Sequence, residues 1–290
     1  MSFSLGVLMQ YICPQHLLSR LTGILANCRW KWFKNWAIRR LIRVHHVNVS
    51  EATSGNLDDY PNFNSFFTRH LRPELRPIAP LAHQLASPVD GTISQMGVIH
   101  DQMIFQAKNF DYSLKTLLGG SDEWAAQFTD GNFATLYLAP RDYHRVHIPC
   151  DGQLQQTIYV PGRLFSVNPL TTESVSGLFA RNERLVCLFD SAAGPMAVIL
   201  VGAMLVGQMR TAWSKESPHS KTVSVERPQP FLIKKGEEVG HFLMGSTVII
   251  LFAKGRIHWD PALRGKTPVR MGQMIGTLTS PSAANDTGHE

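Results

Sequence analysis

One serine in this chain has surroundings that suit an attack on its own backbone. Ser246 stands in the triplet Gly245-Ser246-Thr247, inside an apolar run that extends from 242 to 252. Such a run predicts a buried strand, and a glycine within it permits close or strained backbone approach. The serine hydroxyl would then lie near the Gly245 carbonyl carbon, which is the starting geometry for breaking that peptide bond. A bulge in a core strand, with a hydrogen-bonded Ser and Thr, explains the same triplet without chemistry.

A nucleophilic serine needs a base within hydrogen-bond reach and a third group that orients this base. His144 and His147 are the best candidates for the base, because an imidazole exchanges protons near neutral pH. Two other interpretations stay open, namely hydrogen-bonded core histidines and a metal-binding pair. A metal site would require further clustered ligands, and the histidines at 45, 46, 83 and 100 have no matching spacing, so we expect no metal.

The orienting carboxylate is predicted in the segment Ser87-Pro-Val-Asp90-Gly91. Asp90 has a purely structural alternative, since Asp-Gly turns are common in β proteins. Asp142 and Asp151 compete for the same role, and the pattern alone does not rank the three. A further unusual segment covers 162–169, where Phe165 is predicted to line an apolar pocket and Asn168 to bind substrate, unless it is only a loop closed by Asn-Pro.

The elements that position these residues differ along the chain. Residues 14–47 show apolar residues at helical spacing, interleaved with tryptophans and cations. Residues 1–50 contain seven of the 28 Lys and Arg residues and no Asp or Glu, so the remaining residues have a formal charge of 21 − 22 = −1. This composition favours an amphipathic helix in the headgroup layer of an anionic membrane. A nucleic-acid-binding helix and simple packing against the core remain alternatives.

From about residue 85 the chain alternates short apolar runs with turn residues, which predicts strands. Segment 88–93 resembles 149–154, and 236–240 resembles 272–276, which indicates duplicated β-hairpin units. The glycine spacing is similar to the flattened β-barrels of lipoyl and biotinyl domains, although the hairpin lysine of a carrier is missing. We therefore expect an α+β fold, with N-terminal amphipathic helices before a strand-rich core of such barrel-like units.

The four cysteines form no Cys-x-x-Cys pair, which favours a reducing compartment. No export signal is evident, and the longest apolar stretch, 196–207, is too short to span a bilayer.

Six motifs, taken in order, resemble those of the phosphatidylserine decarboxylase family, in its membrane-associated bacterial form. The resemblance covers about 14–278, and only Met244 departs from the leucine that the family usually has there. The motifs are Phe63-Asn-Ser-Phe66-Phe67-Thr-Arg69, Ser87-Pro-Val-Asp90-Gly91, Tyr143-His144-Arg145-Val-His147, Phe165-Ser-Val-Asn168-Pro169, Gly202-Ala-Met-Leu-Val-Gly207 and Gly245-Ser246-Thr247.

The resemblance implies a self-processing proenzyme. Asp90 would orient His147, which would take the Ser246 proton so that Ser246 attacks Gly245. Position 246 would become a covalent pyruvoyl group, and chains 1–245 and 246–290 would stay associated. The serine headgroup of phosphatidylserine would condense with that group and lose carbon dioxide, and His144 would protonate the product carbon to give phosphatidylethanolamine.

The resemblance divides the chain into a membrane-facing segment, 1–50, and a catalytic core, 51–290. It implies peripheral attachment to the cytoplasmic face of the inner membrane and no nucleic-acid partner, and it leaves a homodimer open. Two competing hypotheses remain. A membrane-associated serine hydrolase would use the same Ser, His and Asp but keep its chain whole, and a non-catalytic membrane-binding β-domain would not need the motif set.

Overall fold

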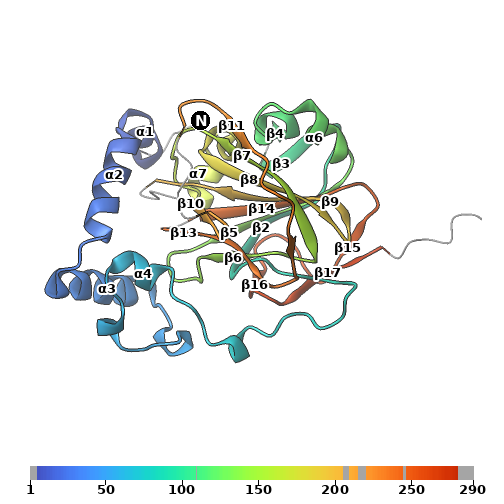
Figure 1. Cartoon of the computed structure of the whole chain (residues 1–290). Coiled ribbons are helices and arrows are strands. Elements are labelled where there is room, and N and C mark those ends of the chain that lie inside the picture. Colours follow the sequence, from blue (N-terminus) through green and yellow to red (C-terminus); the bar gives the residue numbers. More distant parts are fainter. Residues whose placement is uncertain (1–4, 109, 205–208, 215–219, 244–245, 280–290) are drawn as a thin grey trace, which may run out of the picture.

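Antiparallel strands form the body of the protein, and three long helices lie along one side of it (Figure 1). The computed structural model describes residues 5–108, 110–204, 209–214, 220–243 and 246–279. The helices are α1 Leu5–Ile12, α2 Gln15–Ala26, α3 Lys31–His45, α4 Phe63–Phe67, α5 Leu114–Leu117, α6 Asp122–Gln127, α7 Pro169–Thr172 and α8 Leu178–Arg181. The strands are β1 Gln84–Ala86, β2 Gly91–Val98, β3 Met103–Ala107, β4 Phe110–Ser113, β5 Asn132–Leu138, β6 Arg145–His147, β7 Gly152–Val160, β8 Arg184–Ser191, β9 Gly194–Val201, β10 Met209–Thr211, β11 Ser224–Glu226, β12 Leu232–Ile233, β13 Glu238–Phe242, β14 Ser246–Phe252, β15 Ile257–Trp259, β16 Pro268–Val269 and β17 Met274–Leu278.

The largest sheet has nine strands in the order β11-β7-β8-β9-β14-β5-β2-β16, with β12 also paired to β7. Smaller sheets are β1-β17-β15, β10-β13-β6 and the hairpin β3-β4. The α+β class and the leading helices agree with the sequence prediction. The expected barrel-like units are present as open antiparallel sheets, because none of the sheets formed by the described residues closes into a barrel.

The duplication indicated by the sequence is visible in the hydrogen bonds of two loops. Ahead of β2, Ser87 exchanges backbone bonds with Gly272 and Gln273, at 3.0 and 2.7 Å. Ahead of β7, Ile148 makes the corresponding bonds with Gly236 and Glu237, both at 3.0 Å. The two similar segments therefore begin equivalent strands and contact equivalent glycine turns.

The equivalence extends to the two aspartates that follow. Asp90 Oδ1 accepts a bond from the Met271 backbone N–H at 2.8 Å, and Asp151 Oδ1 accepts one from the Lys235 N–H at 2.7 Å. Gly236 and Gly272 both have positive φ, of 84° and 86°, and a Cβ on either would come within 3.0 Å of Ile78. These turns therefore require glycine.

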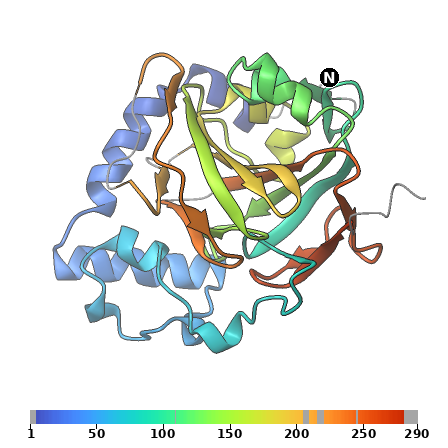
Figure 2. The same cartoon turned by 45° about the vertical axis from the view of Figure 1, so that its right-hand side comes forward.

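The N-terminal helices are attached to the body by buried side chains. Val7 of α1 belongs to the main core, while Gln10 and Gln15 accept backbone bonds from Ser166 and Leu164, at 2.9 and 2.8 Å. The turned view in Figure 2 keeps α2 and α3 along the edge of the sheets. None of the described helices has both the length and the apolarity that a bilayer crossing requires.

Candidate active site

Ser246 begins β14, the strand that pairs with both β5 and β9 inside the large sheet. Every residue of β14 is buried, as the apolar run predicted. The Ser246 side chain is fully buried, and its Oγ has no hydrogen-bond partner among the described residues. Because buried hydroxyls are normally satisfied, this hydroxyl calls for an explanation, and the adjacent Thr247 Oγ1 shares the exception. Gly245 and Met244, the other residues of the predicted cleavage motif, lie outside the described residues.

His144 precedes β6, which pairs with β13, the last strand before Ser246. The His144 carbonyl accepts a bond from the Phe242 N–H at 3.1 Å, and its ring packs on Phe67 with centroids 4.1 Å apart. Its Nδ1 lies 2.8 Å from the Asp142 carbonyl oxygen. A carbonyl only accepts, so Nδ1 carries the hydrogen and Nε2 keeps a lone pair. That Nε2 is buried without a partner among the described residues.

His147 lies at the end of β6 in the same tautomer. Its Nδ1 donates to the Gly236 carbonyl at 2.8 Å, and its Nε2 accepts from the Tyr143 hydroxyl at 3.2 Å. Burial lowers the pKa of His147 and lowers the pKa of His144 to about 3. Both imidazoles are therefore neutral at pH 7, and each presents an Nε2 lone pair as a base.

These shifts predict an acid-sensitive fold. Below about pH 6.5 the unfolded chain takes up protons that the folded chain refuses, so stability is complete above this pH and is lost as the pH falls toward 3. Between about pH 6.5 and 5, the burial of neutral His144 alone should lower the free energy of unfolding by about 2 kcal/mol, at roughly 1.4 kcal/mol per pH unit. We expect His144→Phe to make the melting temperature fall less steeply over this range. Parallel melting curves for parent and variant would contradict this account.

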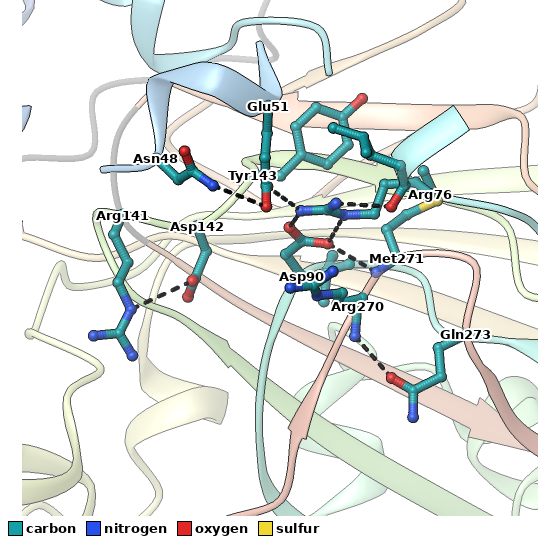
Figure 3. A network of polar contacts seen from close by, with 12 residues as sticks. Asn48, Glu51, Arg76, Asp90, Arg141, Asp142, Tyr143, Arg270, Met271 and Gln273 are labelled. Carbon is teal, nitrogen blue, oxygen red and sulfur yellow. Dashed lines mark hydrogen bonds and ion pairs between the residues drawn. The ribbon is translucent and has the colours of Figure 1, made fainter. Parts of the chain in front are cut away.

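Asp90 takes part in a buried ionic network that reaches back to the N-terminal segment (Figure 3). Arg76 donates to both Asp90 carboxylate oxygens, with Nε at 2.8 Å, and also to Glu51 at 2.6 Å. Asn48 donates to the other Glu51 oxygen at 3.2 Å. Within the described residues, the Asp90 carboxylate bonds only to Arg76 and the Met271 N–H, so its predicted role toward His147 remains a prediction.

The two competing aspartates have other contacts. Asp142 accepts from the Ala139 N–H at 2.7 Å through its side chain and holds His144 through its carbonyl, and burial raises its pKa. Asp151 is exposed and bonds to the Lys235 N–H. The ion pair with Arg76 is therefore what separates Asp90 from its equivalent, Asp151. Arg76 was not predicted from the sequence, because it lies in a proline-punctuated stretch without a recognisable motif.

Removing Arg76 should leave the buried Asp90 carboxylate and the partly buried Glu51 carboxylate without their cation. Its side chain is 4% exposed and that of Asp90 is 11% exposed. We expect Arg76→Met to lower the free energy of unfolding by about 3 kcal/mol, as for other broken buried pairs. Arg72→Met is the matched control, because its 3.8 Å pair with Glu74 is exposed and should contribute no more than about 0.5 kcal/mol. Chemical unfolding measures both, and equal losses would contradict the assignment.

Phe165 and Asn168 make their contacts with residues other than the two histidines. Phe165 is buried, and its ring lies 4.9 Å from the Tyr11 ring of α1. Asn168 caps α7, with its Oδ1 accepting from the Thr171 N–H at 2.9 Å. Their predicted substrate roles are untested by this arrangement. Within the described ranges, no group of three or more His, Cys, Asp or Glu side chains could hold a metal ion.

Known proteins with similar sequences agree with the resemblance seen in the motifs. A family model described as "Phosphatidylserine decarboxylase" matches residues 63–277, and a second, described as "PSD", matches 5–46. The phosphatidylserine decarboxylase proenzyme of Hahella chejuensis (strain KCTC 2396) is 48% identical over 97% of this chain and 96% of its own. The proenzyme of Bordetella avium (strain 197N) is 51% identical over 92% of each chain. This chain therefore belongs to the phosphatidylserine decarboxylase family.

Proposed function

We propose that this protein converts phosphatidylserine to phosphatidylethanolamine and carbon dioxide, using a pyruvoyl group made from its own Ser246. The observation that carries the proposal is the fully buried Ser246 hydroxyl, unpartnered among the described residues, at the start of a central strand. Two neutral imidazoles, His144 just before β6 and His147 at its end, supply bases, and β6 pairs with β13, which precedes Ser246 in the chain. A serine hydrolase keeps its chain whole, so its nucleophile must be reachable in the uncut protein, and the burial of Ser246 there argues against that alternative.

In the self-cleavage step, Ser246 Oγ attacks the Gly245 carbonyl carbon while His147 Nε2 takes the hydroxyl proton. The Gly245–Ser246 amide bond breaks as the Ser246 nitrogen is protonated, and an ester links the two residues. Loss of the Ser246 Cα proton then breaks the Cβ–Oγ bond and releases a carboxylate at Gly245. Water replaces the nitrogen of the remaining residue, ammonia leaves, and a ketone results. The products are chains 1–245 and 246–290, which stay associated.

The site can accommodate a pyruvoyl group, because Ser246 is buried in a dry strand and its oxygen has no competing partner among the described residues. Such a group supplies an electron sink for loss of the carboxylate. His144 is the residue that we assign to the product carbon. Its buried Nε2 has no hydrogen-bond partner among the described residues, so this nitrogen is free to exchange a proton with that carbon.

A denaturing gel and the intact masses of the purified polypeptides test the proposal. We expect two polypeptides, 1–245 and 246–290, the smaller with a blocked N-terminus, together with carbon dioxide release from phosphatidylserine. A hydrolase or a membrane-binding module would give one polypeptide. A single uncut chain that still releases carbon dioxide would refute the pyruvoyl assignment.

We also propose peripheral attachment to the cytoplasmic face of the inner membrane through α2 and α3. Large apolar side chains of these helices are exposed, among them Ile24 and Trp32 at 69% and 70%, and so is Trp30, the N-cap residue of α3, at 68%. Lys31 and Arg39 border the same surface depression as Trp30 and Trp32. Exposed aromatics beside cations suit an anionic headgroup layer.

Replacing Trp30, Trp32 and Trp36 with alanine should weaken vesicle binding. Partial burial of three indole rings in the headgroup layer is worth about 3 kcal/mol, or roughly 100-fold in partition coefficient. Sedimentation with anionic vesicles measures this, and Leu232→Ala, on the exposed strand β12, is the control. Substitution is preferable to deletion, because Gln10 and Gln15 help to hold the catalytic body. Unchanged binding would exclude α3 as the attachment surface.

A further inference from the structure

A cavity of about 230 Å³ lies beside Asp90 and Tyr143, close to the end of α3. It is bordered by His46 and Asn48, which directly follow that helix. Figure 3 shows Asp90 and Arg270 on one side of the polar network, and Arg141 and Asp142 on the other. The charged residues that line the cavity are Arg69, Arg76, Arg141, Arg270, Glu51, Asp90 and Asp142.

The carboxylates of this cavity are already engaged by other groups. Arg76 binds both Glu51 and Asp90. Asp142 accepts from the Ala139 N–H and lies 3.7 Å from Arg141 Nε. No carboxylate is within ion-pair distance of Arg69 among the described residues, although three carboxylates line the cavity.

Arg69 is a buried cation with unused donors. The residue is 4% exposed, and Nη2 donates to the Arg141 carbonyl at 3.1 Å. Its Nε and Nη1 have no hydrogen-bond partner within the described part of the chain. The guanidinium also lies over the Phe66 ring, 5.3 Å from the centroid. Burial lowers the pKa of Arg69, which reflects the cost of keeping this charge away from water.

Arg69 lines the cavity and has two buried donors that no described residue satisfies, and such a guanidinium suits a planar or tetrahedral oxyanion. Arginine binds phosphate through two parallel N–H···O bonds, and such charge-assisted bonds are the strong ones. We propose that Arg69 is the anion-binding residue of this cavity and that it holds the phosphodiester of the lipid headgroup. This inference rests on the proposed function, because it names the residue that takes the phosphate of the same substrate.

The phosphodiester fits this residue better than the carboxylate of the same headgroup does. The carboxylate loses its charge as carbon dioxide leaves, so an arginine bound to it would stabilise the ground state more than the transition state. The phosphodiester keeps its charge throughout, and binding it tightly costs the reaction nothing.

Kinetics on Arg69 variants test the assignment with phosphatidylserine in neutral mixed micelles. We expect Arg69→Met to raise KM by about 10- to 100-fold, the effect of one charge-assisted contact, and to change kcat by less than about threefold. Arg69→Lys should recover part of the affinity. Arg227→Gln, an exposed arginine near β11, should leave both constants unchanged.

Two internal readouts separate substrate binding from a structural role. Self-cleavage should proceed normally in Arg69→Met, and its melting temperature should be unchanged or higher, because a costly buried charge has been removed. A lower melting temperature with an unchanged KM would show that Arg69 is structural and would overturn the proposal.

Ligand binding to an uncut Ser246→Ala protein tests the phosphate directly and does not depend on turnover. Glycerophosphoserine and inorganic phosphate should raise its melting temperature, L-serine should not, and Arg69→Met should abolish both shifts. A shift with serine alone would assign the cavity to the carboxylate, and a shift with inorganic phosphate but not glycerophosphoserine would assign it to free phosphate; either overturns the proposal. If these shifts appear but the native chain is never cut, the proposed function fails while the anion site stands.

Discussion

Ser246→Ala is expected to give a single uncut polypeptide of 290 residues that releases no carbon dioxide from phosphatidylserine. The substitution removes the Oγ that we assign to the attack on Gly245 and to formation of the ketone. Because the Oγ makes no hydrogen bond to the described residues, its loss should leave the fold intact. A denaturing gel, intact mass and a carbon dioxide assay measure the result.

Thr247→Val is the matched control for this experiment. Thr247 is the next residue of β14, is fully buried, and also has an Oγ1 without a partner among the described residues. Removing that hydroxyl keeps the branched shape and should leave cleavage and turnover close to those of the native chain. Cleavage that survives in Ser246→Ala, or that fails equally in Thr247→Val, would mean that a general property of the strand is responsible.

Local patterns predicted the strand that carries Ser246 and the helices that precede the core. Both signals depend on residues close together in the sequence, namely an unbroken apolar run for β14 and helical spacing for α2 and α3. The weak similarity of 88–93 to 149–154 also proved informative, because the two loops make equivalent bonds to Gly272 and Gly236.

The partners of the site residues were much harder to predict. Asp90 receives its bonds from Arg76 and from Met271, which lies 181 positions away along the chain. Such contacts are set by the register of strands that meet only in the folded protein. The Asp-Gly pair directly precedes or begins a strand at both Asp90 and Asp151, yet the pattern contained nothing about the arginine that distinguishes them.

Arg69 illustrates the same limit. It stood at the end of a recognised motif, but its interest depends on two unpartnered nitrogen atoms and on a cavity formed by distant segments. Asn168 caps a short helix through its Oδ1, and its predicted substrate role stays a prediction. Residue type and spacing identify candidate site residues, and long-range packing determines which of their polar atoms have no partner.

His147→Ala and His144→Ala are expected to separate the two stages of the reaction. The first should leave the precursor uncut, because His147 is the base that we assign to Ser246. The second should be cut but should release carbon dioxide about 10²- to 10⁴-fold more slowly, the usual loss of a proton-transfer group. His258→Ala, an exposed histidine on β15, is the control. Fragment masses and a carbon dioxide assay report the two stages separately.

The hydrogen bonds make this a demanding test. His147 Nε2 already accepts from Tyr143, so Ser246 must displace that hydroxyl, and Tyr143→Phe should leave cleavage at least as fast as in the native chain. His144 Nε2 has no partner within the described ranges, and the ring has the same tautomer as that of His147, with the lone pair on Nε2. The reverse result, with His144→Ala uncut and His147→Ala cut, would therefore show that His144 is the base that takes the Ser246 proton. Loss of cleavage in both variants would make the two imidazoles one relay instead of two separate catalysts.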